Sequence, residues 1–195
     1  MARPPRFSYL ADGRYYHVIS RSINQTAIFR DHEDFARVRT LAREAKHQFP
    51  IRLFHYVFMT THFHLVLQTV RAADLALHLR YLKWHYTLWM RKKHGWKGLI
   101  WRERYRSLPI RDETYLSACG LYVELNPVRA GMCRDAAEYA YSSARKYERG
   151  QPDDLLDEYY PAPVPEPLAA AARNPLVADH LFTASDHTAT LPNPA

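Results

Sequence analysis

Residues 51–69 read IRLFHYVFMTTHFHLVLQT, and this stretch predicts two β-strands joined by a tight turn. Residues 51–59 are strongly apolar and rich in β-branched and aromatic side chains, which is typical of a strand. Residues 62–69 form a second such run, and Thr60 and Thr61 separate the two. The sequence therefore predicts a β-hairpin, from which the rest of the fold can be built outward.

The second strand of this hairpin carries two histidines on one face. Side chains alternate along a strand, so Phe63, Leu65 and Leu67 point to one face, which we expect helices to cover, and His62 and His64 point to the other. Imidazoles at i and i+2 lie about 7 Å apart at their α-carbons, so their ring nitrogens can converge on one divalent metal ion. The pattern also fits two histidines that bind no metal.

The flanking sequence predicts strands and helices in a regular order. They are a strand at residues 15–21, a helix from its cap Asp31 to about residue 49, the hairpin, a helix at about 72–93, a strand at 106–111, a helix from Asp112 or Thr114 through Tyr122 to near Asn126, and a short helix or turn at about 135–147. This order predicts an α+β fold of the split β-α-β kind, an antiparallel sheet with helices on one face. The other face would stay free for a ligand. His17 is assigned a packing role, although its strand could neighbour the two histidines.

Residues 113–131, ETYLSACGLYVELNPVRAG, predict a C-terminal helix that carries a tyrosine near its end. Tyr122 and Asn126 are four residues apart and share one helical face, and Pro127 stops the helix. A plain packing role fits Tyr122 as well, because tyrosines are commonly half-buried. Tyr115 lies seven residues earlier, near the same face, and is a competing candidate nucleophile.

Composition divides the chain into a basic body, residues 1–150, and an acidic tail, residues 151–195. The whole chain has a net charge of +7, but the tail holds seven acidic residues and one arginine, which leaves +13 for the body. A body this basic predicts a polyanionic partner, most commonly nucleic acid. Eight of the 13 prolines lie in the tail, which we expect to be extended or disordered. It is interpreted either as a solubilising segment or as a DNA mimic that shields the basic surface.

Several protein classes are disfavoured. No apolar run approaches the roughly 20 residues of a membrane-spanning helix, and the N-terminus lacks the apolar stretch of a secretory signal, so we expect a cytoplasmic protein without a membrane partner. The two cysteines, Cys119 and Cys133, do not form a C-x-x-C pair. A disulfide framework or a zinc site built on cysteines is therefore not expected.

Residues 91–106 are the candidate DNA-binding segment, with seven Lys or Arg, one acidic residue and interleaved aromatic side chains. Positive charge follows a phosphate backbone, and aromatic rings stack on unpaired bases. The candidate contacts are Arg91, Lys92, Lys93, Trp96, Lys97, Trp101, Arg102, Arg104, Tyr105 and Arg106. The alternative is a solvated basic loop whose tryptophans anchor it to the core.

Four motifs in order resemble one known family. Residues 53–69, LFHYVFMTTHFHLVLQT, resemble the histidine-hydrophobic-histidine motif of the single-tyrosine, IS200-like transposases. Residues 99–110, LIWRERYRSLPI, and 115–132, YLSACGLYVELNPVRAGM, are similar to the REP-associated tyrosine transposases. Residues 16–31 and 138–147 match that branch as well, so the resemblance covers roughly residues 8–147. One departure is Thr60-Thr61, where many relatives have Pro-Asn before the first histidine.

The resemblance implies a ferredoxin-like catalytic domain at residues 1–150 and a transposase-type DNA endonuclease and strand transferase. His62 and His64 would bind a catalytic divalent ion, Mg²⁺ or Mn²⁺, and Asn126 would complete the metal site. Tyr122 would be the nucleophile that forms a 5′-phosphotyrosine. The implied substrate is single-stranded or hairpin DNA of the REP type, and the protein would act as a monomer or a homodimer. Two alternatives stay open: a domesticated DNA-binding protein without catalysis, and a metal-dependent phosphodiesterase that uses water.

Overall fold

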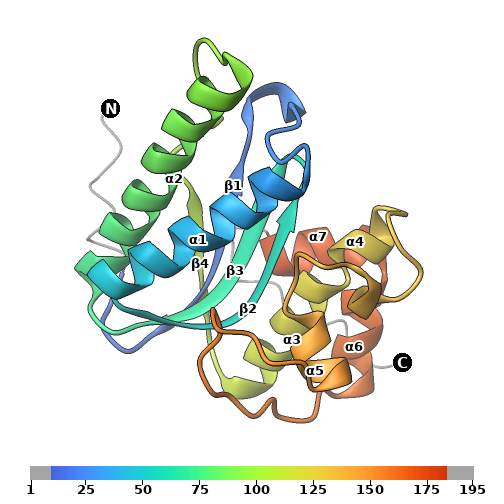
Figure 1. Cartoon of the computed structure of the whole chain (residues 1–195). Coiled ribbons are helices and arrows are strands. Elements are labelled where there is room, and N and C mark those ends of the chain that lie inside the picture. The colour runs from blue at the N-terminus through green and yellow to red at the C-terminus, as the bar shows by residue number, and fades with distance from the viewer. Residues whose placement is uncertain (1–9, 184–195) are drawn as a thin grey trace, which may run out of the picture.

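The computed structural model describes residues 10–183 and is built on a four-stranded antiparallel sheet of order β2-β3-β1-β4 (Figure 1). The elements are β1 (Tyr15–Arg21), η2 (Ile23–Gln25), α1 (His32–Gln48), β2 (Ile51–Met59), β3 (His62–Thr69), α2 (Ala72–His94), β4 (Arg106–Ile110), α3 (Glu113–Glu124), α4 (Asn126–Arg129), η3 (Ala136–Glu138), α5 (Ala144–Arg149), α6 (Glu166–Arg173) and α7 (Pro175–Thr183). The predicted α+β class, a ferredoxin-like split β-α-β arrangement, is confirmed, with the tyrosine on the helix after β4. No helix among residues 10–183 is long and apolar enough to cross a lipid bilayer.

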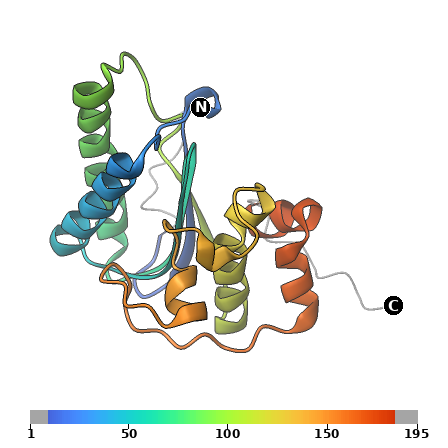
Figure 2. The same cartoon turned by 45° about the vertical axis from the view of Figure 1, so that its right-hand side comes forward.

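Helices cover both faces of the sheet, as Figure 2 shows with the sheet seen close to edge-on. The helices α1 and α2 bury one apolar cluster against it, and α3, α6 and α7 bury a second cluster on the opposite side. The expectation of an open second face is therefore wrong. The physical reason lies in β2, which is apolar on both faces: Tyr56 and Phe58 join the first cluster, and Phe54, Val57 and Met59 join the second.

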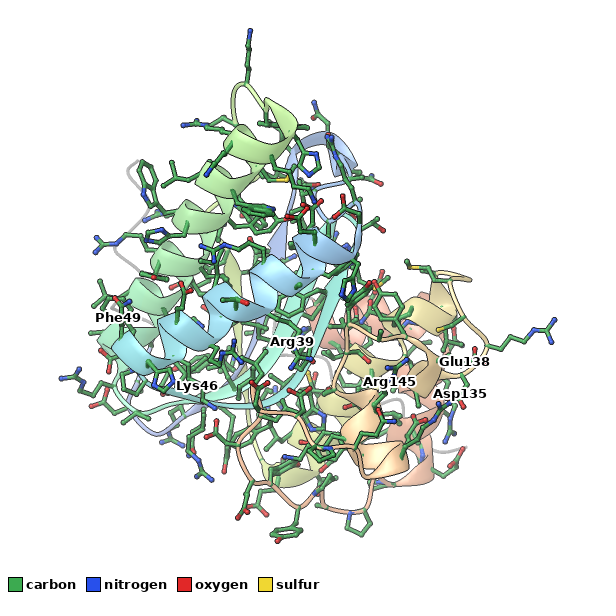
Figure 3. The ribbon with its side chains drawn as sticks, in the orientation of Figure 1. Arg39, Lys46, Phe49, Asp135, Glu138 and Arg145 are labelled. Atoms are coloured by element: carbon green, nitrogen blue, oxygen red, sulfur yellow. The ribbon has the colours of Figure 1, made fainter. Side chains whose placement is uncertain are left out.

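The acidic tail also differs from the prediction of an extended or disordered segment. Residues 151–165 contain no helix or strand, yet ion pairs hold them to α1 at Arg39–Asp153, 2.9 Å, and Lys46–Asp157, 2.6 Å (Arg39 and Lys46 are labelled in Figure 3). Residues 166–183 form α6 and α7, because apolar side chains such as Phe182 give them a face to bury against α3. The last twelve residues of the predicted tail lie outside the described residues.

A glycine lets α3 approach β2 closely. A Cβ atom on Gly120 would lie 2.4 Å from Nε2 of His55, far inside van der Waals contact. His55 has little room to move, because its Nδ1 is 2.8 Å from a Glu124 carboxylate oxygen and its ring packs on Tyr147 at 4.6 Å between centroids. This close contact fixes the height of α3 above the sheet and with it the position of Tyr122, half a turn further along the helix.

We expect Gly120→Ala to lower the free energy of unfolding by about 1–3 kcal/mol, the usual cost of overpacking. Alanine favours helices by about 1 kcal/mol over glycine, so a purely local effect would raise stability instead. Urea denaturation separates the two signs. In a double-mutant cycle with His55→Ala, the combined loss should be smaller than the sum, because removing the imidazole creates space for the new methyl group. A neutral or stabilising Gly120→Ala would contradict the close contact.

Candidate active site

The site is built on the second face of the sheet, where β3 lies beside β1. His64 pairs with Ile19 and His17 with Val66 in the register of the two strands, so the two histidines are diagonal neighbours. Nε2 of His17 lies 2.8 Å from Nδ1 of His64, and Nδ1 of His17 lies 2.8 Å from the carbonyl oxygen of Phe182. A carbonyl only accepts, so His17 donates from Nδ1, accepts at Nε2, and obliges His64 to donate from Nδ1.

This chain of hydrogen bonds leaves a lone pair on Nε2 of His64. Within the described part of the chain that nitrogen is buried and has no hydrogen-bond partner. Burial lowers the pKa of His64 well below its usual value and lowers that of His17 to about 4, so both rings are neutral at pH 7. A neutral imidazole whose second nitrogen is held by a neighbour is the usual state of a metal-ligating histidine.

His62 opens β3 two residues earlier, and its ring lies 5.1 Å from that of His64 between centroids. Its Nδ1 is 2.9 Å from the hydroxyl oxygen of Thr61, which occupies one side of the ring and leaves Nε2 without a hydrogen bond among the described residues. Burial lowers the pKa of His62 to about 4. Two neutral imidazoles with unused nitrogens fit a divalent metal ion, and the atypical Thr61 orients one of them.

Tyr122 of α3 lies directly against the two central histidines. Its ring centroid is 5.9 Å from that of His64 and 5.8 Å from that of His17, edge-on in both cases. Its hydroxyl group donates a 2.8 Å hydrogen bond to Asp179 of α7, and the ring of Phe182 stacks on it at 4.9 Å. Burial, and then the bond to Asp179, raise the pKa of the phenol well above its usual value. Only 1% of Tyr122 is exposed, so α7 covers the candidate nucleophile.

Asn126 and Arg129 hold the end of the tyrosine helix. The amide nitrogen of Asn126 donates to the carbonyls of Tyr122 and Val123, both at 3.1 Å, so only its oxygen remains as a candidate ligand. The guanidinium of Arg129 lies over the ring of Tyr122, 4.3 Å from the centroid, and donates to the Tyr122 carbonyl at 2.8 Å. Its second nitrogen donates to the Ala172 carbonyl of α6. Arg129 therefore connects the tyrosine to the tail.

A cavity of about 660 Å³ opens beside these groups and has a basic mouth. Its lining combines the predicted site residues with the loop after β1: Arg21, Ser22, Asn24, Gln25, Thr61, His62, Arg102, Tyr122, Asn126 and Asp179. The side chains of Arg21 and Arg102 are exposed and make no hydrogen bond or ion pair within residues 10–183. Two free guanidinium groups beside a buried phenol and two neutral imidazoles suit a phosphodiester, because guanidinium matches phosphate geometry.

Comparison with known proteins identifies the family of this chain. The sequence profile described as "Transposase IS200 like" matches residues 11–126, which include both histidines, the tyrosine and the asparagine. The chain belongs to the IS200-like transposase family. A search of curated proteins gave no match.

Two solved structures are similar to this family member. One is a REP-associated tyrosine transposase bound to a REP hairpin, with a TM-score of 0.63 and 19% sequence identity over 84% of this chain and 99% of that one. The other is a crystal structure described as a transposase from Deinococcus radiodurans R1, with a TM-score of 0.43 and 19% identity over 58% of this chain and 89% of that one. At such identity the first likeness shows the shared fold.

Within this IS200-like transposase, the structure brings together most of the predicted site residues. His62, Tyr122 and Asn126 line one cavity, and His64 lies beneath it against Tyr122. The competing Tyr115 is elsewhere: its hydroxyl donates to the Leu181 carbonyl at 2.8 Å, and it is not among the lining residues. The geometry favours Tyr122 over Tyr115 as the nucleophile, and both roles stay predictions.

The predicted DNA-binding segment divides into exposed and packed side chains. The exposed ones are Arg91, Lys92, Lys97, Arg102 and Arg104. Trp101 and Trp96 pack on the core, and Tyr105 is buried within it, while Arg106 is half-buried on β4. The predicted aromatic side chains therefore anchor the segment, and DNA contact by its basic residues stays a prediction.

Lys93, another residue of the predicted DNA-binding segment, pairs with acidic side chains of the protein itself. Ligand atoms of Asp31, Asp34 and His94 lie within 4.8 Å of one another, and the Lys93 ammonium is 2.6 Å from Asp31 and 3.0 Å from Asp34. Burial raises the pKa of Asp34, but hydrogen bonds from His94, Trp89 and Lys93 outweigh it and bring the pKa to about 2. An ammonium already neutralises these carboxylates, so we assign this cluster to bracing α1 against α2 rather than to metal binding.

Sequence reasoning did not assign His17, Arg129 or Asp179 to the site. The contact of His17 with His64 depends on β1 lying beside β3. The only signal for His17 in the sequence was that its strand could neighbour the histidine strand. Asp179 lies 57 residues after Tyr122 and reaches it through the docking of α7. The interpretation of the tail as a DNA mimic did not name Asp179 and stays a prediction.

We expect the double substitution Asp179→Ala and Phe182→Ala to speed DNA nicking. As the predicted nucleophile, Tyr122 would have to leave both contacts before attack, and breaking a hydrogen bond to a charged group costs about 1.5–3 kcal/mol, about tenfold or more in rate. Single-turnover nicking of hairpin DNA measures the change. Glu166→Ala is the matched control. Glu166 lies on α6 and pairs with Arg173, not with Tyr122, so this change should leave the rate unchanged. Slower nicking by the double variant would mean that α7 assists the reaction instead of covering the tyrosine.

Proposed function

We propose that this protein nicks single-stranded hairpin DNA and transfers the strand through a 5′-phosphotyrosine on Tyr122. The observation that carries the proposal is the contact of Tyr122, which lines the cavity, with His64 beneath it, together with Arg21 and Arg102 in the same cavity lining. Membership of the IS200-like family supports the same chemistry, and the structural relative bound to a REP hairpin supports a hairpin substrate.

In the proposed reaction the phenolic oxygen of Tyr122 attacks the scissile phosphorus. The new phosphotyrosine bond replaces the bond from phosphorus to the 3′ oxygen, and the proton lost by the phenol is balanced by the one that the departing 3′-hydroxyl gains. The energy of the broken bond is retained in the new ester, so a second 3′-hydroxyl can reverse the step and join a different strand. Water as the nucleophile would make the cut irreversible.

Each residue of the site has its own role in the proposed reaction. Arg21 and Arg102 bind the phosphate backbone at the mouth, and Arg129 holds the ring of Tyr122 from its far side. His17 keeps His64 in the tautomer with a free Nε2. His62, His64 and the amide oxygen of Asn126 would hold a divalent ion, Mg²⁺ or Mn²⁺. When bound, such an ion neutralises charge on a non-bridging oxygen of the scissile phosphate.

Hairpin DNA labelled at one end and then at the other tests this proposal. With Mn²⁺ present, we expect a 3′ label to migrate with the denatured protein and a 5′ label to appear in a shorter free strand, because a 5′-phosphotyrosine retains the downstream fragment. Free fragments from both labels would indicate water as the nucleophile. Binding without any cut would favour the non-catalytic DNA-binding alternative.

A further inference from the structure

Trp84 is a large apolar side chain that the fold leaves exposed on α2, with 58% of its surface accessible. In Figure 1 α2 lies at the edge of the molecule, on the side of the sheet away from α3. Two cavities flank Trp84, one of about 440 Å³ and one of about 340 Å³, and Leu77 and Arg80 line both of them as well. The indole therefore has open space around it and apolar surface beside it.

The larger cavity has a rigid wall. Trp101 lines it together with Trp84, and its indole N–H donates to the Lys83 carbonyl at 3.2 Å and to the Thr87 hydroxyl at 3.1 Å. The Lys83 ammonium lies over the Trp101 ring, 4.9 Å from its centroid, and donates to the Glu103 carbonyl. Trp101 is thus held in place, whereas Trp84 has no such contact within the described residues. We call the space between them the Trp84 groove.

The charged side chains that line the Trp84 groove are all positive. Arg80 and Arg104 line it, both are exposed, and neither makes a hydrogen bond or ion pair within residues 10–183. No carboxylate is among the lining residues of either cavity. An apolar slot rimmed by free guanidinium groups matches a ligand with flat apolar rings and an anionic backbone. A second copy of this chain has a net charge of +7 and brings no overall excess of negative charge.

The Trp84 groove also adjoins the candidate active site along the chain. Arg102 lines the cavity with Tyr122, and Arg104 lines the groove. Two residues span at most about 7 Å, so the α-carbons of Arg102 and Arg104 are that close, although the active site and the groove lie on different sides of the sheet.

We propose that the Trp84 groove binds unpaired nucleotides of single-stranded DNA, with one base stacked on Trp84 and the backbone phosphates held by Arg80 and Arg104. This inference rests on the proposed function, since it gives the DNA strand a path away from the nicking site. It adds a base-stacking residue, Trp84 of α2, that lies outside the basic segment of residues 91–106, and joins it to Arg104 of that segment.

Fluorescence anisotropy with labelled twelve-residue oligothymidylate, and with a blunt-ended duplex that has no unpaired bases, tests the groove. Base stacking is tolerant of sequence, so thymine suffices as the probe. We expect Trp84→Ala to weaken oligothymidylate binding about tenfold or more, and Trp84→Phe, which keeps an aromatic face, to recover most of it. The ratio of oligothymidylate affinity to duplex affinity should fall for Trp84→Ala and stay at the wild-type value for the control variant. Leu88→Ala is the matched control on the same helix, exposed but outside both cavities.

Salt dependence supplies a second readout. Arg104→Gln should lower the slope of log affinity against log salt by about 0.7 for the single strand, whereas Trp84→Ala should leave the slope unchanged. An equal loss on both DNA probes, or none, would overturn the proposal. Concentration-dependent self-association that Trp84→Ala abolishes would assign the groove to a second copy instead.

Failure here is distinguishable from failure of the proposed function. Oligothymidylate binding that depends on Trp84, together with a wild-type protein that never cuts hairpin DNA, would reject the nicking reaction and keep the groove. Normal nicking with an unchanged oligothymidylate affinity for Trp84→Ala would reject the groove and keep the reaction.

Discussion

Tyr122→Phe is expected to abolish the covalent protein–DNA complex. Phenylalanine keeps the ring that packs against His64, His17 and Phe182, so the fold should persist, but it removes the phenolic oxygen that we propose attacks phosphorus. Removing a nucleophile costs about 10⁴-fold or more in rate. Denaturing gels with labelled hairpin DNA and Mn²⁺ would show the loss.

Tyr115→Phe is the matched control for this experiment. It removes a phenol from the same helix, one whose hydroxyl donates to the Leu181 carbonyl of α7. The adduct should form at the wild-type rate or faster, because that change weakens the tail cover without touching the cavity. If Tyr122→Phe cuts DNA normally, the nucleophile is water or another tyrosine, and the proposed mechanism is wrong.

His64→Ala is the second substitution with a large expected effect. Residues that merely orient a metal ligand cost about 10–100-fold when changed, so removing the ligand itself should cost at least about 100-fold in metal-dependent nicking. Calorimetric titration of the DNA-free protein with Mn²⁺ should show weakened binding. His17→Ala should give the intermediate loss, since His17 acts on His64 through a single hydrogen bond.

A buried histidine elsewhere controls for the loss of an imidazole from the core. His78 of α2 is 2% exposed, and its Nδ1 lies 3.3 Å from the Phe49 carbonyl, on the opposite side of the sheet. His78→Ala should lower stability but leave the nicking rate of folded protein unchanged. Undiminished metal-dependent nicking by His64→Ala would reject His64 as a ligand.

Local signals in the sequence were sufficient for the elements of the body. The bounds of β1, β2 and β3 agree with the prediction because apolar and β-branched runs end abruptly at polar turns. Asp31 caps α1 as predicted, accepting from the Asp34 backbone nitrogen at 3.0 Å. The face of β3 that carries Phe63, Leu65 and Leu67 packs under α1 and α2, as strict alternation requires.

What the sequence did not reveal depends on how distant segments pack. The role of His17 follows from β1 pairing with β3, and no local pattern specifies that neighbour. Likewise α6 and α7 are short, and their helical form depends on burying Leu168 and Phe182 against α3. The proline-rich composition of the tail predicted disorder because composition carries no information about a docking surface elsewhere in the chain.

The proposed mechanism requires that the phenolic oxygen of Tyr122 receive the DNA phosphate. Tyr115 and Tyr122 fall in one tryptic peptide, residues 112–129, so fragmentation mass spectrometry of the purified adduct must locate the nucleotide within it. We predict the phosphonucleotide mass on Tyr122. The same mass on Tyr115 or on a tyrosine outside α3, or a cut strand with no linked peptide, would contradict the assignment of Tyr122 as the nucleophile.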